Sequence, residues 1–315
     1  MAPAVGNDIW WFAKGRKMNQ LLKRRIAAKR REFEKVCDGR IIPEQAKEGV
    51  TEFLDIPYLK DGNRAHLLDV FFPTEYEGTL PVIVNIHGGG LIMGNKEFDR
   101  QFCYCLSKHG FLVFSMEYRL CSEVTVFQQL QDIASAMNKI DRMIPKFYGT
   151  PGIVHVVADS AGAFLALYTA AIQRNPTLAK ETGIRPSYLE IQSMALIRGM
   201  FYTLRKDSIG LFLPPALYGD EYRKHPFYPY LNPNNGAVNR YLPPCLLITS
   251  RRDNLHQYSL DMAAALRRGR TPCILKDYGD ARELTHAFSV FHPESSTSKK
   301  VMEDIKRFFL TYDYE

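Results

Sequence analysis

The stretch from Gly152 to Leu165, Gly-Ile-Val-His-Val-Val-Ala-Asp-Ser-Ala-Gly-Ala-Phe-Leu, constrains the fold of this chain more than any other. Its first half is apolar and β-branched, which is typical of a buried parallel strand. Its second half consists of small residues that lead into an Ala- and Leu-rich helix. A sharp turn between the two would place Ser160 at its apex, with the hydroxyl clear of the sheet. The pattern therefore predicts an exposed serine nucleophile on a strand–turn–helix unit.

Small neighbours are needed around Ser160, because strand and helix nearly touch at such a turn. Ala161 and Gly162 meet this requirement, but Ala158 stands where Gly is usual, two residues before the serine. The alternative interpretation is an ordinary serine that caps a helix N-terminus. The choice depends on whether the rest of the chain supplies the partners that a serine nucleophile needs.

Strands and helices alternate along most of the chain. The two segments 51–59 and 66–72 flank a Lys-Asp-Gly-Asn turn and should pair as strands. Apolar segments at 80–87, 111–117, 152–159, 189–196, 244–250 and 272–277 predict further strands, and amphipathic segments at 98–108, 124–144, 257–268 and 297–311 predict helices. This order predicts an α/β fold with a mostly parallel sheet and helices on both faces.

The chain is long enough, at 315 residues with 46% hydrophobic, for one large α/β domain with an appended cap. No apolar run approaches the roughly 18–20 residues of a membrane-spanning helix. Charged residues interrupt the N-terminus where a secretory signal would be apolar. The six cysteines have no zinc-binding or C-x-x-C spacing and are expected to be reduced thiols. We therefore expect a cytoplasmic protein without a metal site.

The N-terminal segment carries all of the net charge of +7. Residues 1–35 hold ten Lys or Arg and three Asp or Glu, whereas the remaining 280 residues hold 31 of each sign. Within residues 8–36 apolar side chains recur at roughly helical spacing opposite a basic face. The preferred interpretation is a helix that packs as part of a cap. The alternatives are an amphipathic anchor on a membrane surface and a nucleic-acid-binding patch, which nothing else in the chain supports.

The stretch from about 198 to 242 is irregular and rich in Tyr, Phe and Pro. It is too long for a plain loop, so we expect an insertion that joins the N-terminal helix in a cap over the sheet. Its aromatic side chains would line an apolar acyl or aryl pocket, or alternatively pack the core of the cap itself. The expected organisation is residues 1–50 as a basic helical segment of the cap and residues 51–315 as the catalytic domain that contains the insertion.

A glycine-rich loop, His87-Gly-Gly-Gly-Leu-Ile-Met-Gly, directly follows a predicted strand. Consecutive glycines adopt backbone conformations closed to other residues, so the N–H groups of Gly88, Gly89 and Gly90 can point at one oxygen. The N–H of Ala161 would add a donor beside the serine, and these groups together would form an oxyanion hole. A phosphate-binding loop would want Gly-Lys-Ser/Thr, which is absent. We interpret His87 as a structural residue that holds the loop.

A serine nucleophile needs a base that removes its proton and a group that orients this base. We expect His286, in a loop after the last predicted strand, to be the base, with His292 as the second choice. Asp253 follows a predicted strand at the edge of the sheet where ligands bind in open α/β folds, and it would hold the tautomer of His286. Asp277 and Asp280 are closer to His286 in sequence but lie on the wrong loop for the order Ser, Asp, His.

Five motifs in this order resemble the α/β-hydrolase fold and, within it, the hormone-sensitive-lipase-like carboxylesterases. They are, in chain order, His87-Gly-Gly-Gly-Leu-Ile-Met-Gly, Glu117-Tyr-Arg-Leu-Cys-Ser-Glu, Asp159-Ser-Ala-Gly, Asp253-Asn-Leu and His286-Ala-Phe. The chain departs from the family pattern at Ala158, Cys121-Ser122, Asn254 and Ala287, which indicates a divergent member. The resemblance covers about residue 56 to the C-terminus. It implies hydrolysis of acyl esters through an acyl-serine intermediate, no cofactor, a cap built from the N-terminus and an insertion, and often a homodimer.

The sequence thus predicts a serine carboxylesterase for short- to medium-chain or aryl esters, with Ser160 as nucleophile, His286 as base and Asp253 as the orienting acid. Two alternatives use the same fold: a catalytically silent ligand-binding protein, and an acyltransferase or amidase with the same triad. The silent protein would usually lack the base or the acid, and both are present here. The expected partner is a small-molecule ester, and neither nucleic acid nor a membrane span is expected. The acyl chain length depends on how the cap packs and does not follow from the sequence.

Overall fold

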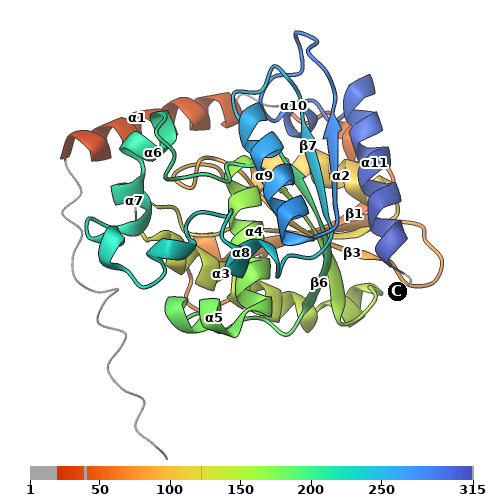
Figure 1. Cartoon of the computed structure of the whole chain (residues 1–315). Coiled ribbons are helices and arrows are strands. Elements are labelled where there is room, and N and C mark those ends of the chain that lie inside the picture. Colours follow the sequence, from red (N-terminus) through yellow and green to blue (C-terminus); the bar gives the residue numbers. More distant parts are fainter. Residues whose placement is uncertain (1–19, 39–40, 122, 314–315) are drawn as a thin grey trace, which may run out of the picture.

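The computed structural model describes residues 20–38, 41–121 and 123–313 (Figure 1). Within these ranges the chain forms a sheet of eight strands in the order β1-β2-β4-β3-β5-β6-β7-β8. The strands are β1 (Val50–Pro57), β2 (Leu67–Pro73), β3 (Val82–Ile86), β4 (Leu112–Met116), β5 (Ile153–Asp159), β6 (Glu190–Ile197), β7 (Cys245–Thr249) and β8 (Cys273–Asp277). The pairs β1–β2 and β2–β4 are antiparallel, and all other neighbours are parallel. The predicted α/β class with a mostly parallel sheet is confirmed.

Helices cover both faces of the sheet, as Figure 1 shows for α9 and α11. The longer helices of the sheet layers are α2 (Arg100–Lys108), α3 (Val126–Asp141), α4 (Ser160–Arg174), α9 (His256–Gly269) and α11 (Ser296–Tyr312), with α5 (Pro176–Thr182) and α10 (Phe288–Phe291) as short connections. Apolar residues of α3, α4 and α9 form one core cluster, and those of α2, α10 and α11 form a second. Along β3, Val82 and Val84 belong to the first cluster and Ile83 to the second, because successive strand residues point to opposite faces.

The insertion between β6 and β7 consists of short helices and turns: α6 (Ser208–Phe212), α7 (Pro214–Tyr218) and α8 (Gly236–Asn239). Two of its aromatic side chains, Tyr218 and Phe227, are buried and pack against Phe127 of α3, with ring centroids 6.2 and 5.7 Å away. These rings therefore contribute to the packing core of the insertion. In contrast, Leu211 and Phe212 of α6 are exposed.

The basic N-terminal segment forms helix α1 (Gln20–Asp38) over its described part. α1 packs on the domain through two apolar side chains: Ile26 is buried in the first core cluster, and Phe33 lies 4.9 Å from the ring of Phe98. Its described Arg24, Arg25 and Arg31 side chains are exposed. The part of the predicted segment before residue 20 lies outside the described residues.

No helix within the described ranges is long and apolar enough to cross a membrane. Cys103, Cys105, Cys121 and Cys245 are buried free thiols, and Cys273 is a partly buried one. The predicted reduced state of these five cysteines therefore agrees with the structure. Cys37 falls among the residues whose side chains are not described.

Candidate active site

Ser160 lies at the junction of β5 and α4, on the turn that the sequence predicts. Its φ angle is +48°, a left-handed conformation that an L-residue adopts only under strain. The turn is very tight, because a Cβ atom on Gly162 would lie 2.0 Å from the carbonyl oxygen of Ile86. Ala158, which replaces the usual Gly, is fully buried in β5 and is accommodated between β3 and β6. The strand–turn–helix prediction is correct for this stretch.

His286 and Asp253 lie in a line with Ser160. His286 Nε2 is 2.9 Å from Ser160 Oγ, and His286 Nδ1 is 2.9 Å from Asp253 Oδ1. Because a carboxylate can only accept, Nδ1 carries the hydrogen and Nε2 is free to accept a proton from the serine. The Asp253 side chain is wholly buried, whereas that of His286 is 34% exposed. Solvent is therefore excluded from the Asp253 carboxylate but reaches the His286 ring.

Three strand ends bring these side chains together at one edge of the sheet. Ser160 follows β5, Asp253 follows β7, and His286 follows β8, at the carboxyl ends where parallel strands meet. The Asp253 carboxylate also accepts the N–H of Leu255 at 2.9 Å, which fixes the acid loop. Ala287, where the family has Gly, has φ +55° and is the N-cap residue of α10. A left-handed residue at this position explains why glycine is usual there.

The glycine-rich loop folds into a tight turn beside the serine. Gly89 and Gly90 have φ angles of +115° and +64°, and the N–H of Met93 donates to the carbonyl of Gly89 at 3.0 Å. Gly88 faces Asp159, since a Cβ on Gly88 would lie 2.3 Å from Asp159 Oδ2. Burial raises the pKa of Asp159 well above its ordinary value, and Asp99 adds to this, while His87 and the backbone N–H of Gly88 act in the opposite direction. Gly88 therefore lies directly against the Asp159 carboxylate.

His87 is buried and has a structural role in this loop, as the sequence suggests. Its Nδ1 contacts the carbonyl of Gly88 at 2.8 Å, its Nε2 lies 3.2 Å from Glu117, and its ring stacks on Tyr118 at 4.2 Å. Burial by itself would lower the pKa of His87, but the Glu117 carboxylate, together with Asp99 and the Gly88 backbone, outweighs burial and raises the pKa to about 9. Both ring nitrogens face acceptors, which is what a protonated imidazolium requires.

The remaining candidates lie elsewhere. His292 is exposed after α10. Asp277 and Asp280 lie 3.6 and 3.7 Å from nitrogen atoms of Arg251. His155 contacts Ser193 and Asp313 at 2.8 and 2.7 Å. None of these four side chains is part of the Ser160 arrangement described above.

Sequence reasoning missed Arg198, which is completely buried beside Asp253 and follows β6. In the sequence it is only the first residue of the irregular stretch 198–242. Its position carries a usable signal, because a charged residue directly after the apolar run Met-Ala-Leu-Ile lies at the same sheet edge as the serine. Buried arginines are rare unless paired, so a role at this edge could have been suspected.

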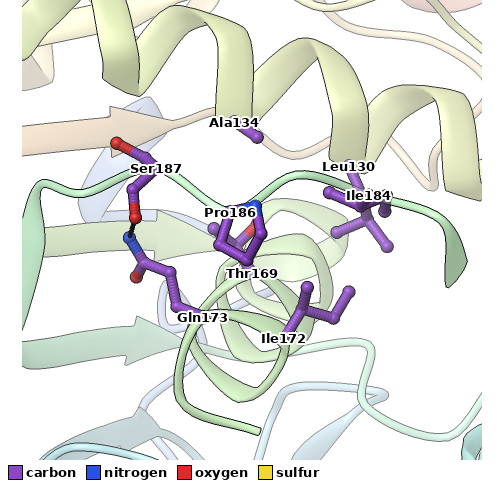
Figure 2. Close-up of a pocket in the computed structure, with 8 residues that line it drawn as sticks. All are labelled: Leu130, Ala134, Thr169, Ile172, Gln173, Ile184, Pro186 and Ser187. Atoms are coloured by element: carbon purple, nitrogen blue, oxygen red, sulfur yellow. Dashed lines mark hydrogen bonds between the residues drawn. The ribbon is translucent and has the colours of Figure 1, made fainter. Parts of the chain in front are cut away.

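A small cavity lies between α3, α4 and the loop 184–187, and Figure 2 shows the side chains that line it. Its volume is about 10 Å³, which is about one water-sized sphere. Thr169, one of its lining residues, is about 14 Å along α4 from Ser160 at 1.5 Å per residue. The cavity is therefore a packing gap and not a substrate pocket. Within the described ranges no cluster of three or more His, Cys, Asp or Glu could hold a metal ion.

Comparisons with known proteins agree with this architecture. A family model described as the alpha/beta hydrolase fold matches residues 83–289. Esterase B from Lactobacillus rhamnosis is 22% identical, with 93% of this chain and 95% of that chain covered and a TM-score of 0.86. Brefeldin A esterase, a bacterial homologue of human hormone sensitive lipase, is 20% identical over 94% and 87% of the two chains, with a TM-score of 0.73. An esterase from Pyrobaculum calidifontis is 21% identical over 92% and 99%, with a TM-score of 0.67.

Proposed function

The chain belongs to the alpha/beta hydrolase family, and from this premise we propose that it is a serine carboxylesterase. Ser160 is the nucleophile, His286 the general base and Asp253 the acid that orients the base. The observation that carries the proposal is the pair of 2.9 Å contacts that link Ser160 Oγ to His286 Nε2 and His286 Nδ1 to Asp253 Oδ1. Support also comes from the strained turn at Ser160, since such strain is concentrated at functional sites.

In the proposed reaction, His286 Nε2 takes the proton of Ser160 as Oγ attacks the ester carbonyl carbon. The tetrahedral intermediate collapses when His286 returns this proton to the leaving alcohol oxygen, which leaves an acyl-serine. Water then attacks the acyl carbon with the same base, and the carboxylic acid is released. Asp253 stabilises the imidazolium that forms in both steps.

The oxyanion is held, in this proposal, by the N–H groups of Gly89, Gly90 and Ala161. Gly88, which the sequence includes among the donors, lies against the Asp159 carboxylate. We therefore propose Gly89 and Gly90 as the donors from the glycine-rich loop. Each remaining donor is expected to contribute about 10²–10³ in rate, as in other oxyanion holes.

Short- to medium-chain or aryl esters are the proposed substrates. Esterase B from Lactobacillus rhamnosis has been crystallised with a tributyrin phosphonate, and two other similar structures are a bacterial heroin esterase and a brefeldin A esterase. We infer that α1 and the insertion 198–242 form the cap that limits the acyl group. Cytoplasmic location, a homodimer and a membrane contact of residues 8–36 remain predictions.

The decisive experiment replaces Ser160 with Ala and measures hydrolysis of a short-chain aryl ester. We expect turnover to fall by about 10⁴ or more, because the triad acts as a unit. Ser135→Ala is the matched control, since Ser135 is a partly buried serine on α3 whose hydroxyl contacts only Gln131 of the same helix within the part of the chain that the structure describes. This control should keep wild-type turnover. Wild-type turnover in Ser160→Ala would contradict the proposal.

A fluorophosphonate probe distinguishes the alternatives on the same fold. An esterase should take up one probe mass per chain at Ser160, whereas a catalytically silent binding protein should take up none. Competing alcohols and amides in the assay separate a hydrolase from an acyltransferase or an amidase, because the products differ.

A further inference from the structure

Arg198 is an unusual residue for the position it occupies. It follows β6 directly, its side chain is 0% exposed, and its φ angle is +51°, in the left-handed region. Its backbone N–H donates to Ile248 of β7 at 2.8 Å. Burying a long cationic side chain costs free energy unless an opposite charge and hydrogen-bond acceptors lie beside it. The contacts of Arg198 therefore indicate what its burial serves.

The guanidinium of Arg198 links the loop that carries Asp253 to the loop that carries His286. Its Nη2 donates to Ser250 Oγ at 2.7 Å, and Ser250 Oγ in turn donates to the carbonyl of Leu284 at 2.6 Å. The guanidinium carbon also lies 4.1 Å from the centre of the Phe288 ring. Ser250 precedes the acid Asp253, and Leu284 and Phe288 lie on either side of the base His286. Arg198 thus contacts both loops that carry the base and its partner.

Arg198 also faces the oxygen of Asp253 that the triad leaves unused. Asp253 Oδ1 receives both the His286 Nδ1–H and the Leu255 N–H. Asp253 Oδ2 is buried and has no hydrogen-bond donor among the described residues, but Arg198 Nε lies 3.5 Å from it. Burial lowers the pKa of Arg198 to about 10, so the guanidinium remains charged at neutral pH. A cation therefore balances the buried carboxylate on the side away from the histidine.

We propose that Arg198 is a positioning residue of the esterase site. It balances the charge of Asp253 and keeps the loops that carry Asp253 and His286 in their positions relative to each other. The inference rests on the proposed function, because it assigns Asp253 and His286 their roles. A displaced base loses proton-transfer geometry in the transition state, whereas the Arg198 side chain is 0% exposed and does not reach a bound substrate. The expected signature is a loss in kcat without a comparable change in KM.

The test compares Arg198→Gln with Arg198→Lys, which differ in charge but can both donate a hydrogen bond. We expect kcat for an aryl ester to fall by about 10- to 100-fold in Arg198→Gln with KM within about twofold, and Arg198→Lys to keep a larger share of kcat. Arg100→Gln is the matched control: Arg100 of α2 pairs with the buried Asp69 of β2 at 3.0 Å and with Glu97 at 3.6 Å, and among the described residues it has no ion pair with Asp253 or His286. Its kcat should stay within about twofold of wild type.

Four outcomes would overturn the inference: wild-type kcat in folded Arg198→Gln, equal losses in the Gln and Lys variants, an equal loss in Arg100→Gln, or a change confined to KM. Thermal unfolding identifies which variants fold. If Arg198→Gln does not fold, Ser250→Ala carries the test, because it removes the link from Arg198 to Leu284 and leaves the charge. We then expect kcat to fall by about 3- to 10-fold at unchanged KM, and an unchanged kcat overturns the inference.

Failure of the proposed function is recognised separately. If the wild-type protein hydrolyses no ester but reacts with a fluorophosphonate at Ser160, the esterase assignment fails, and the labelling rates of Arg198→Gln and wild type test Arg198 instead. Slower labelling of the variant supports the positioning role, and equal rates overturn it. If wild type reacts with neither ester nor probe, both proposals are wrong.

Discussion

The two sides of the candidate site are held in place by different means. On the acid–base side, one wholly buried side chain, Arg198, contacts the loops of both Asp253 and His286. On the oxyanion side, the glycine-rich loop is anchored at several points. His87 pairs with Glu117. Gln129 of α3 donates to the carbonyl of Leu91, and Arg30 of α1 donates to the carbonyl of Ile92. The acid–base side therefore relies on one buried side chain, whereas the oxyanion side combines glycine backbone shape with several side-chain anchors.

The anchors of the oxyanion side also differ in their depth. His87 is wholly buried and the Glu117 side chain is 12% exposed, but the side chain of Arg30 is 23% exposed and belongs to a helix outside the sheet layers. Buried charged pairs are strongly coupled to folding, while exposed ones contribute little. We therefore expect the largest loss of activity or stability when the glycine backbone is changed. A smaller loss should follow from breaking the His87–Glu117 pair, and the smallest from removing Arg30.

The largest effect on the oxyanion side is expected from Gly89→Ala. A Cβ at this position would lie 2.0 Å from the carbonyl oxygen of Met93, at a φ of +115°. The loop must move to accommodate it, and the N–H groups of Gly89 and Gly90 would move with it. We expect kcat for an aryl ester to fall by at least about 10²-fold, the cost of losing an oxyanion donor. Steady-state kinetics together with thermal unfolding measure this effect.

Gly90→Ala is the matched control for this prediction. Its φ of +64° is strained for alanine, at a cost of about 1–2 kcal/mol, but a Cβ there would meet nothing closer than 3.8 Å. It should therefore lose stability and keep much more of kcat than Gly89→Ala. Equal losses of kcat in the two variants would mean that backbone shape at Gly89 is not what holds the oxyanion side.

The second effect concerns the pH dependence of stability. The His87 pKa of about 9 lies above the value of about 6.5 for an unfolded histidine. The contribution of His87 to the free energy of unfolding is therefore fully present below about pH 6.5 and is lost as the pH rises through about 9. The shift corresponds to about 3 kcal/mol of unfolding free energy. Urea denaturation of the wild type at pH 6 and pH 10 should show this loss as a fall in stability toward high pH.

Glu117→Gln should remove most of this pH dependence, because the amide cannot hold the proton on His87. The variant should be less stable than wild type at pH 6 and approach it at pH 10. Lys29→Gln, which removes only an exposed charge on α1, should keep the wild-type pH dependence. An unchanged pH dependence in Glu117→Gln would show that the His87–Glu117 pair is not coupled to folding.

Much of the acid–base side could be predicted from the sequence, because its residues follow recognisable strands. Ser160, Asp253 and His286 are each placed by local patterns and by their order along the chain. The supporting contacts could not be predicted in the same way. The interactions of Gly88 with Asp159, of Arg198 with Asp253 and of Arg30 with Ile92 join residues 50 or more positions apart. Such contacts depend on how loops pack in three dimensions, which periodicity and spacing do not encode.

The cap aromatics show the same limit. The composition of residues 198–242 favours both a pocket lining and a packing core, and only the structure shows Tyr218 and Phe227 buried against α3. The sequence likewise does not decide whether the N-terminal segment is a cap helix or an anchor on a membrane surface. Burial of Ile26 and the contact of Phe33 with Phe98 place the described part of α1 on the domain, which favours the cap interpretation.

The smallest effect is expected from Arg30→Met, which tests whether α1 supports the oxyanion loop. Arg30 Nε and Nη2 both donate to the carbonyl of Ile92, at 3.0 and 2.9 Å, within the glycine-rich loop. Methionine keeps much of the apolar stem but loses both bonds. We expect kcat to fall by about 3- to 10-fold, consistent with the loss of charged hydrogen bonds at a partly exposed site.

Lys29→Met is the control for Arg30→Met, because it removes a neighbouring charge from the same helix while leaving the loop untouched. Among the described residues Lys29 pairs only with the exposed Glu32, at 3.0 Å, so kcat of the variant should stay within about twofold of wild type. A loss in both variants would assign the effect to the positive charge of α1. A loss in neither would mean that the loop does not depend on Arg30. A loss confined to Arg30→Met would make α1 part of the oxyanion side, which would then depend on a segment outside the sheet layers as well as on its own backbone.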